Sequence, residues 1–159
     1  MHRRENWGKP MEETLKAVRD YLEKHKDIYL VFPMHLNPLV RNTVHKVLDG
    51  FERKILIEPL EYLEFIAIMD GAHYIMTDSG GVQEEAPSLG KPTLVLRDTT
   101  ERPEAIEAGT AKLTGTKYED VIKDMELLEG EAYEKMSKAN NPYGDGKTSE
   151  RIRKHLETI

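Results

Sequence analysis

Short β-rich runs alternate with longer helical patterns along most of this chain, and this alternation is the feature that most limits how it can fold. The apolar runs predict strands at residues 28–32, 55–57, 74–76, 93–96 and 111–114. Between them, apolar residues recur at helical spacing, as in the stripe Met11, Leu15, Val18 and Leu22. Strands and helices in this order predict an α/β fold, a Rossmann-like parallel sheet with helices on both faces.

The helical patterns have recognisable starts and ends. Pro10 and Pro38 suit the first turn of a helix, and Gly50 and Gly90 suit the position just after one. Residues 60–69 are apolar on most sides, which predicts a well-buried core helix. Beyond residue 116 only helical patterns remain, at about 118–128, 131–139 and 148–155, with a turn-rich segment at 140–149.

Length and charge limit the class of protein. A chain of 159 residues suits one domain with a core of its own. Its 23 basic and 29 acidic side chains give a net charge of −6, which argues against nucleic acid as a partner. The absence of cysteine excludes disulfides and thiolate zinc sites. No apolar stretch is long enough for a membrane span or a signal peptide, so we expect no membrane partner and a cytoplasmic location.

The segment TDSGGVQEE, residues 77–85, lies where a predicted strand passes into a predicted helix. Free backbone N–H groups and the helix dipole make such a turn a candidate anion site, and glycines let a phosphate approach the backbone closely. An acid one turn later could accept hydrogen bonds from a ribose. The alternative to an anion site is an ordinary helix start, with two conformationally flexible glycines and acidic side chains that are only solvated. Asp78 is expected to cap the helix rather than to take part in chemistry.

A few charged residues outside this segment are candidates for a site. Arg3 and Arg4 beside Glu5 would suit phosphate recognition, although they could equally be surface charges. His2 and His35, taken alone, would more often be solvated or structural residues. The remaining histidines fit no motif and are expected to be surface or structural, namely His25, His45, His73 and His155.

Five segments in one order carry a more specific signal: HRREN, HLNP, TDSGGVQEEAPSLGKP, TTERPEAIEAGT and NPYGDGKTSERI. Together they resemble the non-hydrolysing UDP-N-acetylglucosamine 2-epimerases. The resemblance runs along the whole chain but covers only about the C-terminal half of that family, whose members have a two-domain, GT-B-like architecture. It implies that residues 1–159 form a single UDP-binding domain, the C-terminal domain of such a fold.

The resemblance implies a role for individual positions. The diphosphate of UDP would be held by Ser79, Gly80 and Gly81, and its ribose by Glu85. The uracil would meet the backbone around Pro59 and Leu60. His2 would be the catalytic residue that faces the reacting sugar. A regulatory or sugar site would use Arg3, Glu5 and His35, and the cleft would also be faced by Arg102 and Glu104.

The resemblance also implies a reaction, the interconversion of UDP-N-acetylglucosamine and UDP-N-acetylmannosamine. UDP would be eliminated to leave a 2-acetamidoglucal and would then add back, with C2 inverted. No metal or other cofactor would be needed. The implied partners are UDP and UDP-N-acetylhexosamines, the family's N-terminal domain in cis or in trans, and a second copy in a homodimer of the full enzyme.

Two departures from the family pattern lead to further expectations. The acidic residues that handle the C2 proton belong to the family's N-terminal domain, so this chain by itself is expected to be inactive. Family members also carry an apolar strand directly before HRREN, and here Met1 stands where that strand would end. We therefore expect the first central strand to be missing, with the sheet split there or closed by another chain.

Other functions remain open from the sequence. A hydrolysing epimerase or a GT-B glycosyltransferase could share the same UDP site. The intact HRREN segment and the ERPE sequence at 101–104 favour the non-hydrolysing epimerase. A non-catalytic UDP-sugar-binding fragment is the third alternative.

Overall fold

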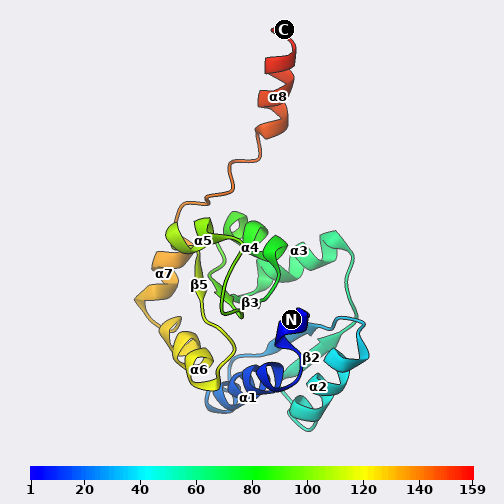
Figure 1. The fold of residues 1–159 in the computed structure, drawn as a ribbon. Helices are drawn as coiled ribbons and strands as arrows, with labels where there is room; N and C mark the ends of the chain where they lie inside the picture. The colour runs from blue at the N-terminus through cyan, green and yellow to red at the C-terminus, as the bar shows by residue number, and fades with distance from the viewer.

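The computed structural model describes residues 1–159, with short strands that all pair in parallel (Figure 1). The strands are β1 (Leu30–Pro33), β2 (Lys54–Ile57), β3 (Ile75–Thr77), β4 (Thr93–Val95) and β5 (Ala111–Leu113). Each lies within two residues of a run predicted to be a strand, because short apolar runs between turn residues are a clear signal of buried parallel strands. The predicted α/β class is confirmed.

The strands form two separate sheets. One has the order β1–β2, with Val31 opposite Ile55, and the other has the order β3–β4–β5, with Met76 opposite Leu94. β1 and β3 therefore each keep one edge without a partner. The expected split at the place of a central strand is confirmed.

The helices connect the strands and follow their ends. They are η1 (Arg4–Asn6), α1 (Lys9–Lys24), α2 (Pro38–Leu48), α3 (Tyr62–Gly71), α4 (Gly80–Glu85), η2 (Ala86–Leu89), α5 (Pro103–Glu107), α6 (Tyr118–Leu127), α7 (Glu131–Ser137) and α8 (Thr148–Leu156). Pro38 occupies the first turn of α2, as predicted, and Asn37 caps that helix by accepting a hydrogen bond from the Leu39 N–H. None of the helices is long and apolar enough to cross a membrane.

α1 joins the two sheets into one body. Its N-terminal half contributes Met11 and Leu15 to a cluster with α2, whereas Val18 and Leu22 belong to a cluster with β4 and α6. Both sets lie on the single apolar stripe seen in the sequence. On the other side of β4, Val95 packs with Ala105 of α5, so helices cover both faces of that sheet.

The prediction that residues 60–69 form a well-buried helix is wrong in its burial. α3 forms, but only Met69 is buried, and Leu63 is 79% exposed. α3 has no continuous sheet to pack against, because β1 and β3 do not pair with each other and belong to separate sheets. Val31 and Ile55, on the open face of β1 and β2, are exposed as well.

The C-terminal end of the chain leaves the body of the molecule. α8 stands away from the rest in Figure 1, and residues 144–159 are all exposed. The helix is held only by local pairs such as Arg151 with Asp145. Its apolar side chains, Ile152 and Leu156, contact no other element of the fold and are exposed.

Candidate functional site

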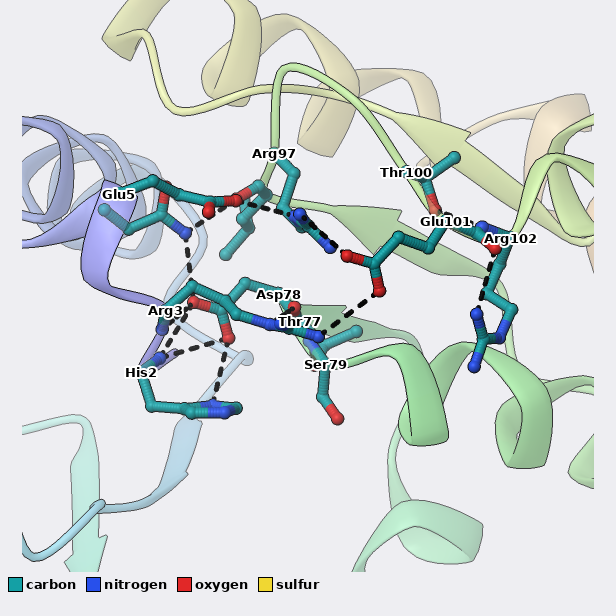
Figure 2. A network of polar contacts seen from close by, with 12 residues as sticks. His2, Arg3, Glu5, Thr77, Asp78, Ser79, Arg97, Thr100, Glu101 and Arg102 are labelled. Atoms are coloured by element: carbon teal, nitrogen blue, oxygen red, sulfur yellow. Dashed lines mark hydrogen bonds and ion pairs between the residues drawn. The ribbon is translucent and has the colours of Figure 1, made fainter.

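The motif segments meet at the carboxyl ends of the strands, the place where open α/β sheets bind ligands. Asp78 follows β3, Arg97 follows β4 and His35 follows β1. The segment from His2 to Asn6, here called the η1 segment, lies among these strand ends (Figure 2). Residues that are far apart in the sequence thus share one edge of the fold.

Asp78 holds the η1 segment in place. Its side chain is fully buried, and its Oδ2 accepts hydrogen bonds from the His2 N–H at 2.8 Å and the Arg3 N–H at 2.8 Å. The Asn6 Nδ2 donates to the same oxygen at 3.0 Å and also to the Leu96 carbonyl. The expectation that Asp78 caps α4 is therefore wrong, because its carboxylate is turned toward the other segment.

The pKa of Asp78 reflects two opposing causes. Burial alone would raise it, but the N-terminal ammonium and the N–H donors of the η1 segment outweigh that cost and hold the pKa below 3.8. The carboxyl group is therefore ionised at neutral pH. A buried carboxylate with this many donors is a rigid anchor.

His2, the predicted catalytic residue, contacts both Asp78 and His35. Its Nδ1 lies 3.3 Å from the Asp78 Oδ1. Its ring stacks on that of His35, with centroids 5.4 Å apart and planes 14° apart. Burial lowers the pKa of His2 below 6.5, and the opposing attraction of Asp78 only partly offsets this, so His2 is neutral at pH 7.

An open pocket of about 520 Å³ lies beside His2. It brings the predicted catalytic residue together with three residues that the resemblance placed in a regulatory or sugar site and adds three more. Its lining is His2, Arg3, Arg4, Glu5, Trp7, His35 and Asn37. Trp7 also fixes the η1 segment, since its indole N–H donates to the His2 carbonyl at 3.1 Å. The pocket is thus polar, basic and lined by two stacked imidazoles.

Arg97 connects the η1 segment to the loop before α5, and sequence reasoning did not identify it. Its side chain is 8% exposed, and its Nε donates to Glu5 at 2.8 Å (Figure 2). Its Nη2 lies 3.6 Å from Glu101, which is also paired with Arg3 at 3.7 Å. An arginine directly after an apolar buried strand was the signal that could have pointed to it.

The glycine pair presents free backbone donors. The Ser79 N–H donates to the Thr77 hydroxyl oxygen at 3.0 Å. The N–H groups of Gly80, Gly81 and Val82 donate to no acceptor in the chain. Such free donors at a strand-to-helix turn can hold an anion. This is the arrangement that the sequence predicted for residues 79–81.

Arg102 lies against Gly80, the first residue of this glycine pair. A Cβ on Gly80 would stand 3.6 Å from the Arg102 guanidinium, which forms an ion pair with Glu84. The N–H group of Arg102 is held by the Thr100 hydroxyl, and that hydroxyl donates to Gln83 of α4. A cation therefore lies beside Gly80, one of the residues with a free N–H group.

Other predicted residues are not drawn into this cluster. Glu85 ends α4 half-buried and forms no side-chain hydrogen bond, and Glu104 is exposed in the first turn of α5. Pro59 and Leu60 lie between β2 and α3, where no hydrogen bond or ion pair joins them to the glycine pair. No group of three or more acidic or histidine side chains is arranged to hold a metal ion.

A parallel α/β fold with a glycine turn and charged loops at its strand ends is the architecture of nucleotide-binding proteins. The chain matches the UDP-N-acetylglucosamine 2-epimerase family over residues 1–157 and therefore belongs to that family. This confirms the resemblance carried by the five motif segments.

Three similar proteins illustrate the match. The UDP-N-acetylglucosamine 2-epimerase of Bacillus subtilis is 54% identical over 157 residues, which are 98% of this chain and 41% of that protein. The S. aureus MnaA–UDP co-structure superposes with a TM-score of 0.93 at 51% identity, over 98% of this chain and 43% of that one. The Neisseria meningitidis UDP-GlcNAc 2-epimerase bound to UDP-GlcNAc gives a TM-score of 0.92 at 47% identity, over 99% of this chain and 43% of that one.

This chain thus spans about two fifths of the length of these relatives, as those shares show. The matching part is the C-terminal portion of the GT-B-type structures. The members of the family are named epimerases, and because an epimerase is an isomerase the family is an isomerase family.

Proposed function

We propose that this chain is the UDP-binding part of a non-hydrolysing UDP-N-acetylglucosamine 2-epimerase. The observation that carries the proposal is the glycine pair, whose N–H groups are free and whose Gly80 lies beside the Arg102 guanidinium. Backbone donors and a cation in one place suit a diphosphate. Two of the similar structures, named for UDP and for UDP-GlcNAc, support this choice of ligand.

In this proposal Ser79, Gly80 and Gly81 hold the diphosphate, and Arg102 exchanges part of its pairing with Glu84 for the incoming anion. Glu85 accepts hydrogen bonds from the ribose, and the backbone near Pro59 and Leu60 meets the uracil. A preorganised set of donors suits a reaction in which UDP is both leaving group and returning nucleophile, because negative charge develops on the diphosphate as the bond to C1 breaks.

The sugar extends from the diphosphate toward His2 and the pocket beside it. Arg3, Glu5 and His35 contact the sugar or a second nucleotide sugar there, and Glu104 faces the cleft. The reaction inverts C2 through elimination and re-addition of UDP. The groups that move the C2 proton come from the part of the family's chain that precedes this one, so we expect residues 1–159 alone to bind UDP without epimerising it.

Calorimetric titration of the chain with UDP tests the nucleotide site. We expect Ser79→Ala and Glu85→Ala to weaken binding, and Gly80→Ala to weaken it by about tenfold or more, because its Cβ would stand 3.6 Å from the Arg102 guanidinium, where the proposal places the diphosphate. Gly71→Ala is the matched control, since a Cβ there meets nothing within 4 Å. A folded chain that does not bind UDP would overturn the proposal.

A second experiment tests the reaction. The N-terminal part of a relative is supplied in trans with UDP-N-acetylglucosamine, and the products are followed by proton NMR. We expect UDP-N-acetylmannosamine to appear. Release of free N-acetylmannosamine would indicate a hydrolysing enzyme instead, and transfer of the sugar to an acceptor would indicate a glycosyltransferase. Sedimentation of the reconstituted protein would test the proposed homodimer, and cell fractionation the cytoplasmic location.

A further inference from the structure

The contact between His2 and Asp78 bears on which nitrogen of the His2 ring carries the proton. A neutral imidazole has one N–H and one lone pair, and the hydrogen bond made by one nitrogen fixes the character of the other. His2 is neutral at pH 7 because burial lowers its pKa. Its tautomer therefore decides what it can offer to a ligand.

The two oxygens of Asp78 differ in how well they are satisfied. Oδ2 accepts from the N–H groups of His2 and Arg3 and from the Asn6 amide, all within 3.0 Å. Oδ1 accepts one longer hydrogen bond, from the His2 N–H at 3.1 Å, and the N-terminal nitrogen lies 3.8 Å from it. A carboxylate oxygen can accept two hydrogen bonds, so Oδ1 has room for a further donor.

The His2 Nδ1, 3.3 Å from Oδ1, is placed to supply that donor. A lone pair on Nδ1 would instead face the negative oxygen across the same distance, which is unfavourable beside a carboxylate that is itself fully buried. We propose that Asp78 is a positioning residue that holds His2 as the Nδ1–H tautomer and leaves Nε2 with its lone pair for the bound ligand. This inference rests on the proposed function for the identity of that ligand.

A specific consequence follows for recognition. Nδ1 is turned to Asp78 and one ring face is covered by His35, so Nε2 is the ring nitrogen left for the pocket. A nitrogen with a lone pair accepts a hydrogen bond but cannot donate one. His2 therefore recognises a sugar hydroxyl or the acetamido N–H rather than a phosphate oxygen. When Nε2 takes a proton, the Asp78 carboxylate stabilises the resulting imidazolium.

NMR of the 159-residue chain labelled with ¹⁵N-histidine tests this directly. Long-range ¹H–¹⁵N correlations at about pH 8, where imidazoles are neutral, distinguish a protonated from an unprotonated ring nitrogen. The His2 signals are identified with His2→Gln. We expect a protonated Nδ1 and an unprotonated Nε2. In Asp78→Asn the amide can donate to Nδ1, so we expect the His2 tautomer to reverse while the other histidines do not change.

Asp70→Asn is the matched control, because Asp70 is exposed and forms no hydrogen bond or ion pair. A His2 with its proton on Nε2 in the unmodified chain would overturn the inference, and so would a folded Asp78→Asn variant with an unchanged tautomer. If that variant does not fold, the spectrum of the unmodified chain decides. UDP binding is measured separately, so a chain that binds UDP but has the other tautomer contradicts this inference alone.

Discussion

At the scale of single residues, Asp78 and His2 lie 76 positions apart in the sequence but share a contact at the centre of the site. The motifs marked both segments, yet they did not show that one segment anchors the other. A carboxylate just before a helix is usually a cap, so local reasoning assigned Asp78 to the wrong partner. The same limit applies to Arg97, whose partners Glu5 and Glu101 come from two different loops.

Asp78→Ala should strongly destabilise the chain. The substitution leaves the Asn6 amide and the N–H groups of His2 and Arg3 without an acceptor at a buried position. We expect the free energy of unfolding to fall by about 3 kcal/mol. Urea unfolding followed by circular dichroism measures it. A loss below about 1 kcal/mol would mean that water or neighbouring groups replace the carboxylate.

Arg97→Met should have a much smaller effect on stability. The Arg97 Nη1 is buried without a partner, whereas Glu5 and Glu101 are 55% and 58% exposed and can return to water. Apolar replacement of a buried charge whose partners can be solvated is often close to neutral. We expect a change within about 1 kcal/mol in the same urea experiment. A loss as large as that of Asp78→Ala would show that the charge network holds the fold together.

At the scale of elements, the sequence predicted where helices and strands lie but not what covers them. α3 has apolar residues on most sides, a pattern typical of a buried helix. Its exposure in the structure follows from the unpaired edges of β1 and β3, which leave no continuous sheet beneath it. Periodicity reports the surface of a helix, whereas burial depends on the elements that other parts of the chain supply.

The unpaired strand edges should be visible in hydrogen exchange. Backbone N–H groups alternate in direction along a strand, and the Leu30 N–H points to β2 while the Ile75 N–H points to β4. The N–H groups of Val31 and Met76 therefore point away from their paired strands. We expect these two amides to exchange faster than those of Phe32 and Thr77. Equal protection at all four positions would show that another segment pairs with the open edges.

α8 should be dispensable for the stability of this chain. Residues 144–159 are all exposed, and the apolar side chains of α8 contact no other element. Removal of residues 148–159 deletes no core contact, so we expect the unfolding midpoint to stay within about one degree of the intact chain. Differential scanning calorimetry of the two chains measures this. A clear loss of stability would place α8 on the body of the domain.

At the scale of the whole molecule, α1 is the element that makes one body of two sheets. It contributes to both apolar clusters, and the η1 segment just before it closes the site between the ends of β1 and β3. Packing and the candidate site thus depend on the same stretch of chain. Changes in the protonation of His2 and Asp78 should consequently affect the stability of the whole fold.

Stability should decrease on acidification in two steps. The pKa of His2 is below 6.5 in the folded chain because of burial, so the unfolded chain binds more protons below about pH 6.5 and is favoured there. The pKa of Asp78 is below 3.8, so its contribution is present above that pH and is lost as the pH falls through the folded value. Urea unfolding between about pH 7 and pH 3 should show both steps, and His2→Gln should remove the first.

Local patterns in the sequence determined the α/β class, the strand and helix positions and the family, because apolar periodicity, turn residues and motif spacing are all properties of neighbouring residues. They also located the glycine pair and the η1 segment. The tertiary structure decided what those patterns do not encode: the pairing of Asp78 with His2, the bridge made by Arg97, and the exposure of α3 and α8. These depend on contacts between distant segments, and only folding brings such segments together.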